Sequence, residues 1–420
     1  MKKDNFKWLL MIGATLVAAA TNVNNMAIAP ILGDVAKDIG ISIPAAQASL
    51  LGIFVFVVAI ATLISGTLAD RFGTMPVMIL SLALTTAPSL LFPIAGNSIS
   101  ILMAFRVCQG FGAGAVFSLL PLIAAEWFSE EEKGISVGAG MTGINGGMMI
   151  GVALSPMINA VTGNWRTTMS WLGYADFVIL LYVIYLTVQY KKHTPLNHTV
   201  QSENGKSAGS DIKAALCNPR TWIGIVMCML ISWLLNALND LTPQYFALPD
   251  PMGVGFGAIV SGRLMLIVQF GTVVSSLLSG IIIDKVFKGN TKPVLLIGFI
   301  LTGLLTYTIL FPVVYSNRVL LIVILFLAGT FVAFLNPAAS TFVAQSYPDH
   351  IIGRITGLWL GIGAFGGALG VFVGAFALHS TGNYHLTITL VTIVAIVGLI
   401  LSRVIGTKKI HAEEIVSADR

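Results

Sequence analysis

The sequence predicts an all-α membrane protein with twelve transmembrane helices, arranged as two pseudo-symmetric six-helix bundles around a central cavity. Three observations support this prediction: the composition, an internal repeat and the number of long apolar runs. Of the 420 residues, 56% are hydrophobic and 10% are charged, whereas a soluble domain has about 25% charged residues. A chain this apolar cannot bury its side chains in one soluble core, so lipid is the expected solvent.

The internal repeat is clearest at two polar segments, each lying between two apolar runs. Residues 279–284 repeat the Ser, Gly and Asp of residues 65–70 at a distance of 214 positions. Two further pairs follow in the same order: residues 22–25 with 236–239 at the same offset, and the glycine-rich residues 134–151 with 353–370 at an offset of 219. Ordered matches at half the chain length indicate a tandem duplication.

Twelve apolar runs have the length, about 20 residues, that a helix needs to cross about 30 Å of hydrocarbon. They lie near residues 8–30, 45–69, 76–95, 99–127, 134–160, 166–189, 220–243, 257–283, 293–314, 318–345, 352–379 and 384–405. The long polar segment in the middle is predicted to be a flexible linker. The predicted domains are therefore an N-terminal bundle (1–189), a cytoplasmic linker (190–218), a C-terminal bundle (219–406) and a cytoplasmic tail (407–420).

The distribution of charge predicts the orientation. An even number of spans places both termini on one side, and assigning that side to the cytoplasm puts about eighteen Lys and Arg residues inside and about three outside. The outside residues are Lys37, Arg166 and Arg318. We therefore expect a multi-pass protein of the plasma membrane, the inner membrane of a bacterium. The basic residues lie in loops and form no stripe, so the net charge of +5 does not indicate nucleic-acid binding.

Two short motifs give the chain a resemblance to a known family. The pattern G-x-x-x-D-R-x-G is matched by Gly66, Asp70, Arg71 and Gly73, and the pattern R-x-x-Q-G by Arg106, Gln109 and Gly110. With these motifs in a chain of two matching halves, nearly the whole chain resembles the major facilitator superfamily of secondary transporters. The chain departs from the first motif at Thr74 and Met75, where basic residues are usual. The resemblance implies alternating access by two rocking bundles, and a working monomer.

The first motif implies a gate at the cytoplasmic ends of the helices. In the family, the Asp of this loop contacts the start of the eleventh helix, here near Gly353, and the Arg joins a charge cluster. A carboxylate is well placed at a helix start because the exposed amides and the macrodipole favour it. The alternative is an ordinary solvated turn. The predicted gating residues are Gly66, Asp70, Arg71, Gly73, Glu126 and Asp284.

Polar residues inside the apolar runs predict a binding site, because an ionisable group in a membrane is costly. Counting residues at about 1.5 Å each places Asn22, Arg106, Asn236 and Arg263 in one layer, roughly 9–12 Å below the outer ends of their helices. The forked donors of two arginines suit carboxylate, sulfonate or phosphate oxygens. The predicted substrate-binding residues are Asn22, Asn25, Arg106, Gln109, Asn236, Asn239 and Arg263.

Each of these residues has a structural alternative. In the alternative, Arg106 pairs with Asp176 and only holds the N-terminal bundle together, and Arg263 pairs with Asp240 and closes an outer gate. The asparagine side chains would then form hydrogen bonds that hold helices together. Under the transport hypothesis, Asp240 and Asp176 are the candidate proton-coupling residues, because a carboxylate released by its arginine takes up a proton more easily.

The sequence lacks the glycine loop that nucleotide-driven pumps use to bind phosphate, so a gradient is the expected energy source. We expect a proton-coupled secondary transporter of a small organic anion, not an enzyme, with no cofactor or metal. The alternative is a proton-driven exporter of hydrophobic or drug-like compounds. Drug antiporters of the superfamily usually carry G-P-x-x-G-G in the fifth helix, and here that helix lacks the Gly-Pro pair. A third possibility is a receptor or scaffold that moves nothing.

Overall fold

The computed structural model describes residues 3–190, 215–288, 290–347 and 349–404. For some residues in these ranges, Asp70 and Asp284 among them, only the backbone is described. The described chain contains twelve helices that are long and apolar enough to cross a membrane, as the sequence predicts, and no strand. The predicted linker lies mostly, and the predicted tail entirely, outside the described residues.

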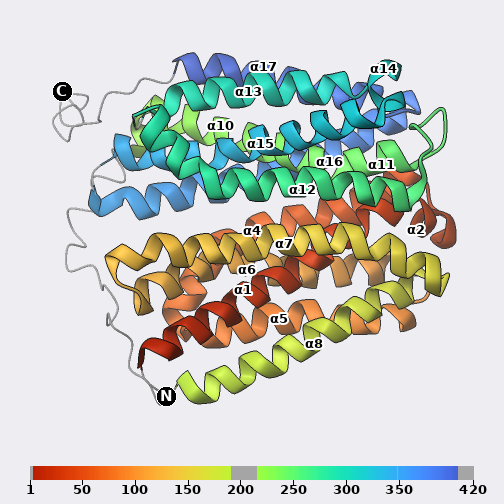
Figure 1. Cartoon of the computed structure of the whole chain (residues 1–420). Helices are drawn as coiled ribbons and strands as arrows, with labels where there is room; N and C mark the ends of the chain where they lie inside the picture. Colours follow the sequence, from red (N-terminus) through yellow and green to blue (C-terminus); the bar gives the residue numbers. More distant parts are fainter. Residues whose placement is uncertain (1–2, 191–214, 289, 348, 405–420) are drawn as a thin grey trace.

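The N-terminal half forms the lower bundle in Figure 1. Its membrane-spanning helices are α1 (Lys3–Ala27), α4 (Ile53–Phe72), α5 (Thr74–Leu91), α6 (Ile99–Trp127), α7 (Glu130–Thr162) and α8 (Trp165–Tyr190). Five short elements connect or extend them: η1 (Ala29–Ile31), α2 (Leu32–Ile39), α3 (Ile43–Ala46), the π turn η2 (Gln47–Gly52) and η3 (Phe92–Ile94).

The C-terminal half forms the upper bundle in Figure 1. Its spanning segments are α10 (Pro219–Asn236) continued by the π turn η4 (Ala237–Leu241) and α11 (Thr242–Ala247), α12 (Gly257–Ile281), α13 (Thr291–Thr308), α15 (Arg318–Ser346), α16 (Asp349–Thr381) and α17 (His385–Val404). The remaining elements are the π turn η5 (Ile282–Val286) and α14 (Pro312–Ser316). We call the end of the molecule near residues 3, 190, 219 and 404 the terminal side, and the opposite end the far side.

Glycines hold equivalent helix pairs together in the two halves. In α7, a Cβ on Gly147 would lie 2.2 Å from the carbonyl oxygen of Ala19 in α1. In α16, a Cβ on Gly366 would lie 1.9 Å from the carbonyl oxygen of Met229 in α10. Small residues let helix backbones approach this closely in a membrane. The glycine repeat found in the sequence therefore marks the tight packing of the fifth helix on the first, and of the eleventh on the seventh.

Replacing Gly147 with alanine should lower thermal stability, because the new methyl group would collide with backbone. Overpacking of this kind costs about 1–3 kcal/mol. Gly146 is the matched control, since a Cβ there meets nothing within 4 Å, and alanine is the better helix former. Thermal unfolding of the two purified variants tests this. Equal melting temperatures for Gly147→Ala and Gly146→Ala would contradict the packing argument.

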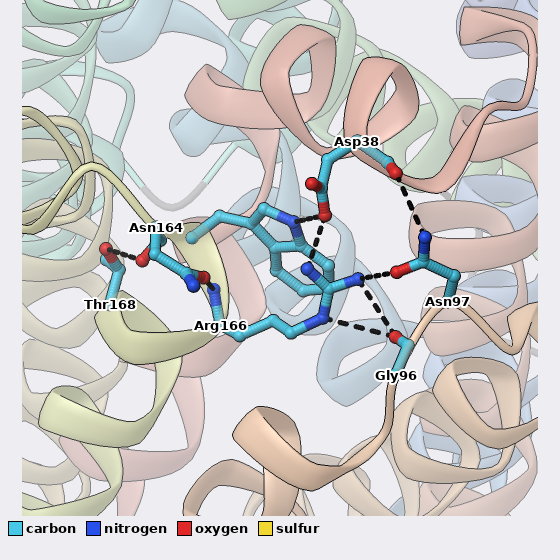
Figure 2. Close-up of polar contacts among 7 residues, drawn as sticks. Asp38, Gly96, Asn97, Asn164, Arg166 and Thr168 are labelled. Carbon is cyan, nitrogen blue, oxygen red and sulfur yellow. Dashed lines mark hydrogen bonds and ion pairs between the residues drawn. The ribbon is translucent and has the colours of Figure 1, made fainter.

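A polar cluster fixes the far side of the N-terminal half (Figure 2). Arg166, at the start of α8, donates hydrogen bonds to the Gly96 carbonyl and to Asn97 Oδ1 and forms an ion pair with Asp38 of α2. Trp165 Nε1 donates to the same Asp38 carboxylate at 3.0 Å. Hydrogen bonds to charged groups contribute about 1.5–3 kcal/mol each. Arg166 therefore ties the start of α8 to α2 and to the far-side loop between η3 and α6.

The two halves meet along two pairs of helices. In the first pair, α4 lies against α16, where the rings of Phe56 and Phe365 are 5.5 Å apart. In the second, α7 lies against α12, where Asn145 Nδ2 donates to Ser276 Oγ at 3.1 Å. Farther toward the far side, a Cβ on Gly262 of α12 would lie 2.6 Å from the carbonyl oxygen of Val152 in α7.

Candidate functional site

Arg106 lies in α6, and its side chain is buried, with 1% of its surface exposed. Its Nε donates to the carbonyl oxygen of Leu50 at 2.7 Å, and its Nη1 donates to the carbonyl oxygen of Asn24 at 3.0 Å. Leu50 belongs to the π turn η2, and such turns interrupt the regular α-helical hydrogen bonds and often occur at functional sites. The guanidinium also lies 4.1 Å from the ring centre of Phe54, so it is held on three sides.

A chain of hydrogen bonds connects Arg106 to Asp176. Arg106 Nη1 donates to Gln109 Oε1 at 2.9 Å, and Gln109 Nε2 donates to Ser89 Oγ at 2.9 Å. Ser89 Oγ lies 2.9 Å from Asn24 Oδ1, and Asn24 Nδ2 donates to Asp176 Oδ2 at 2.6 Å. The described side chains of Arg106 and Asp176 form no direct ion pair, so the alternative in which they pair is wrong. We call these five residues the Arg106 network.

The network depends on two residues that the sequence analysis did not select, Asn24 and Ser89. Both are buried polar residues within apolar helices. Their polar side chains within apolar runs are the sequence feature that could have identified them. The selection favoured Asn22 and Asn25 because they recur in the second half, whereas Asn24 corresponds to Leu238 and does not.

Asp240 approaches the site from the C-terminal half. It lies in the π turn η4 and is 1% exposed. An ionised Asp240 would attract the Arg106 guanidinium across the boundary between the halves. Among the described residues, Asp240 Oδ2 and Arg106 Nη2 are buried atoms without a hydrogen-bond partner. The site therefore contains one donor group and one acceptor atom that remain unsatisfied.

Arg263 does not share the environment of Arg106. Its side chain is exposed, on the face of α12 that also exposes Ile259 and Phe270. The described side chains of Arg263 and Asp240 form no ion pair, so that alternative is also wrong. Of the two arginines that the residue count places in one layer, Arg106 is buried and Arg263 is exposed. The count gives the depth in the membrane and not the direction of the side chain, so a substrate-binding role for Arg263 stays a prediction.

The asparagines of the first and seventh helices lie in partly equivalent settings. Asn22 Nδ2 donates to Ala18 O at 2.9 Å, and Asn236 Nδ2 donates to Ser232 O at 2.8 Å, each one turn earlier in its own helix. Asn25 is half-buried, whereas Asn239 is buried and accepts a hydrogen bond from Gln269 Nε2 at 3.1 Å. The repeat therefore extends to side-chain hydrogen bonding at the first position of each pair.

The predicted gating residues lie at the terminal side. Gly73 has φ +87°, which favours glycine, and it forms the turn between α4 and α5. Arg71 is exposed, with its guanidinium 5.3 Å from the ring centre of Phe72. Glu126 accepts hydrogen bonds from Thr74 Oγ1 at 3.1 Å and from Tyr190 OH at 3.4 Å. A Cβ on Gly66 would meet nothing within 4 Å.

The side chains of Asp70 and Asp284 lie outside the described part of the structure. The gate therefore stays a prediction.

A separate cavity of about 280 Å³ lies at the far side, between η1 and α2 of one half and α11 of the other. Its lining includes Asp34, Gln244 and Leu248 but no member of the Arg106 network. The Arg106 and Asp240 side chains are both buried in this conformation.

Comparison with known proteins agrees with this architecture. The family model described as Major Facilitator Superfamily matches residues 10–292 and 246–416. The chain is 24% identical to the 4-hydroxybenzoate transporter PcaK of Pseudomonas aeruginosa, over 91% of this chain and 89% of that one. It is 24% identical to the sialic acid transporter NanX of Escherichia coli, over 90% and 88%. It is 26% identical to the bacillibactin exporter of Bacillus subtilis, over 89% and 90%. The chain belongs to the Major Facilitator Superfamily, and it is a membrane transporter, not an enzyme.

Proposed function

We propose that this transporter moves a small organic anion, carboxylate- or sulfonate-like, across the plasma membrane by alternating access, together with protons. The single observation that carries the proposal is the buried Arg106 guanidinium, whose Nη2 group has no hydrogen-bond partner among the described residues. A buried donor without a partner costs about 1–3 kcal/mol, and more when it is charged. An anionic oxygen bound at this group would remove that cost.

The network favours an anion with planar oxygens. Leu50, Asn24 and Gln109 occupy Nε and Nη1 and fix the orientation of the guanidinium. The remaining Nη2 group then presents its donors in a defined direction. The names of two relatives support an acid as the substrate, since they describe transport of 4-hydroxybenzoate and of sialic acid. Asn25 and Asn236, which are only half-buried, are the proposed polar contacts to the rest of the solute.

A count of buried charges supports proton coupling. When ionised, Arg106 contributes one positive charge, and Asp176 and Asp240 contribute one negative charge each. A bound monoanion would leave the site with two excess negative charges in a medium where uncompensated charge is expensive. One proton on Asp240 and a second on Asp176 would restore neutrality. Asp240 is the proposed principal coupling residue because its Oδ2 has no hydrogen-bond partner among the described residues, whereas Asp176 accepts from Asn24.

The proposed orientation places the terminal side in the cytoplasm, as the distribution of Lys and Arg predicts. The described contacts between the halves include buried hydrogen bonds at the far side. In this orientation the protein would be closed toward the outside.

A panel of ligands tests the proposed substrate class. A compound that binds the native state raises its apparent stability by mass action. We expect small carboxylates or sulfonates to raise the melting temperature of the detergent-solubilised protein, and sugars and lipophilic cations to leave it unchanged. Stabilisation by lipophilic cations alone would contradict the anion proposal. That result would favour the second candidate function, export of larger or hydrophobic compounds, for which the similarity to the bacillibactin exporter is the supporting observation.

A further inference from the structure

Three buried polar side chains meet where the two halves touch at the far side. Gln47 begins the π turn η2 of the N-terminal half, whereas Gln244 of α11 and Tyr384 just before α17 belong to the C-terminal half. Each has 1% or less of its surface exposed. The Tyr384 hydroxyl lies 2.9 Å from Gln47 Oε1 and also contacts Gln244 Oε1. We call these three residues the far-side junction.

Backbone carbonyls fix the orientation of both glutamine amides. Gln47 Nε2 donates to the carbonyl oxygen of Val371 in α16 at 3.1 Å, across the boundary between the halves. Gln244 Nε2 donates to the carbonyl oxygen of Asp240 at 2.8 Å. Rotating either amide by half a turn would place its oxygen against a carbonyl oxygen. Each glutamine must therefore present its Oε1 to Tyr384.

The Tyr384 hydroxyl has one proton to donate, yet it faces two amide oxygens. It can satisfy Gln47 of the opposite half or Gln244 of its own half, but not both at once. The closed far side therefore contains one buried acceptor that is always short of a donor, which is unfavourable. When the halves separate, Tyr384 keeps Gln244 as its partner and water hydrates Gln47.

We propose that Tyr384 is a positioning residue for transport, and that its shared proton makes the far-side junction a weak, reversible latch. A fully satisfied buried junction would hold the halves together firmly, whereas this one stabilises the closed state only partly. Gln244 also links the latch to the proposed coupling residue, because its side chain bonds the backbone of Asp240 in the π turn η4. A change in the shape of that turn would move Gln244 relative to Tyr384.

The latch can be tested without a substrate, so its result is independent of the proposed function. Ala258 is half-buried and lines the far-side cavity, which has walls from both halves. A cysteine placed there, in a full-length chain with its own three cysteines changed to serine, reports the opening of the far side by its rate of reaction with a maleimide. Detergent solution exposes both ends of the protein, so the orientation in the membrane does not matter.

Tyr384→Phe should speed the labelling about 3- to 10-fold, because the closed state loses a hydrogen bond and keeps two buried acceptors. Tyr315→Phe is the matched control: it removes a half-buried far-side hydroxyl of the same half that has no hydrogen bond to another described residue, and its labelling rate should equal that of the parent. An unchanged rate in Tyr384→Phe would overturn the latch, as would an equal increase in Tyr315→Phe.

Gln244→Met tests the shared proton itself. Removing the competing acceptor lets Tyr384 donate to Gln47 alone, so the closed state should strengthen and labelling should slow. A purely structural role predicts the opposite, since any disturbance of the junction would loosen it. If the labelling rate rises in Gln244→Met as it does in Tyr384→Phe, the Tyr384 proton is not shared between the two glutamines.

Discussion

Arg106→Gln is expected to abolish anion binding and to lower transport about 100-fold or more. The change removes the positive charge and the Nη2 donors while leaving a polar side chain of moderate size. Losing one partner of a buried, hydrogen-bonded charge pair costs about 2–5 kcal/mol, and 1.4 kcal/mol corresponds to a factor of ten. Melting curves with the stabilising anion, and uptake into proteoliposomes, measure the two effects.

Arg263→Gln is the matched control because it removes the same charge from the opposite half at an exposed position. Its ligand stabilisation and uptake should stay within about twofold of the parent, because exposed charges contribute little. Arg106→Lys adds a second comparison, since lysine keeps the charge but loses the planar fork. Full binding in Arg106→Gln, or its loss in Arg263→Gln, would show that the anion binds elsewhere.

Asp240→Asn should uncouple transport from the proton gradient. The variant is permanently neutral at this position, so it mimics the protonated state and no proton is released there. Uptake driven by a pH gradient should fall about 10-fold or more, whereas exchange of labelled for unlabelled anion, which needs no net proton movement, should continue. The two assays are run on the same proteoliposomes.

The corresponding Asp176→Asn variant separates the two carboxylates. Asp176 accepts a hydrogen bond from Asn24 and lies at the end of the Arg106 network, so we expect a smaller loss of driven uptake than at Asp240. Driven uptake that survives both substitutions together would contradict proton coupling through these residues.

The architecture could be predicted because it depends on features that are local in the sequence. The length of each apolar run determines whether it spans the membrane, and the duplication appears as repeated letters. The tight glycine contacts at Gly147 and Gly366 also follow from the repeat, since both halves use the same packing. The boundaries of the first helix were less accurate: the predicted run is 8–30, whereas α1 spans Lys3–Ala27 and is followed by the short elements η1 and α2.

The site was predicted only in part, because its geometry depends on contacts between distant helices. Arg106 and Gln109 were found, but not the partners Asn24 and Ser89. The π turns that carry Leu50 and Asp240 leave no clear pattern in the sequence. Arg263, in contrast, was included on its depth alone. The depth of a residue in the membrane does not say which face of the helix its side chain occupies. The far-side junction joins residues 47, 244 and 384, which only the folded chain brings together.

The most direct test of the central claim is counterflow in proteoliposomes that contain the purified chain. Vesicles are loaded with an excess of the unlabelled anion that stabilised the protein best, and labelled anion is supplied outside. Our account predicts a transient accumulation of label inside, present in the parent and in Arg263→Gln and absent in Arg106→Gln. No exchange by the parent protein, or equal exchange by Arg106→Gln, would contradict the assignment of the buried arginine as the anion site.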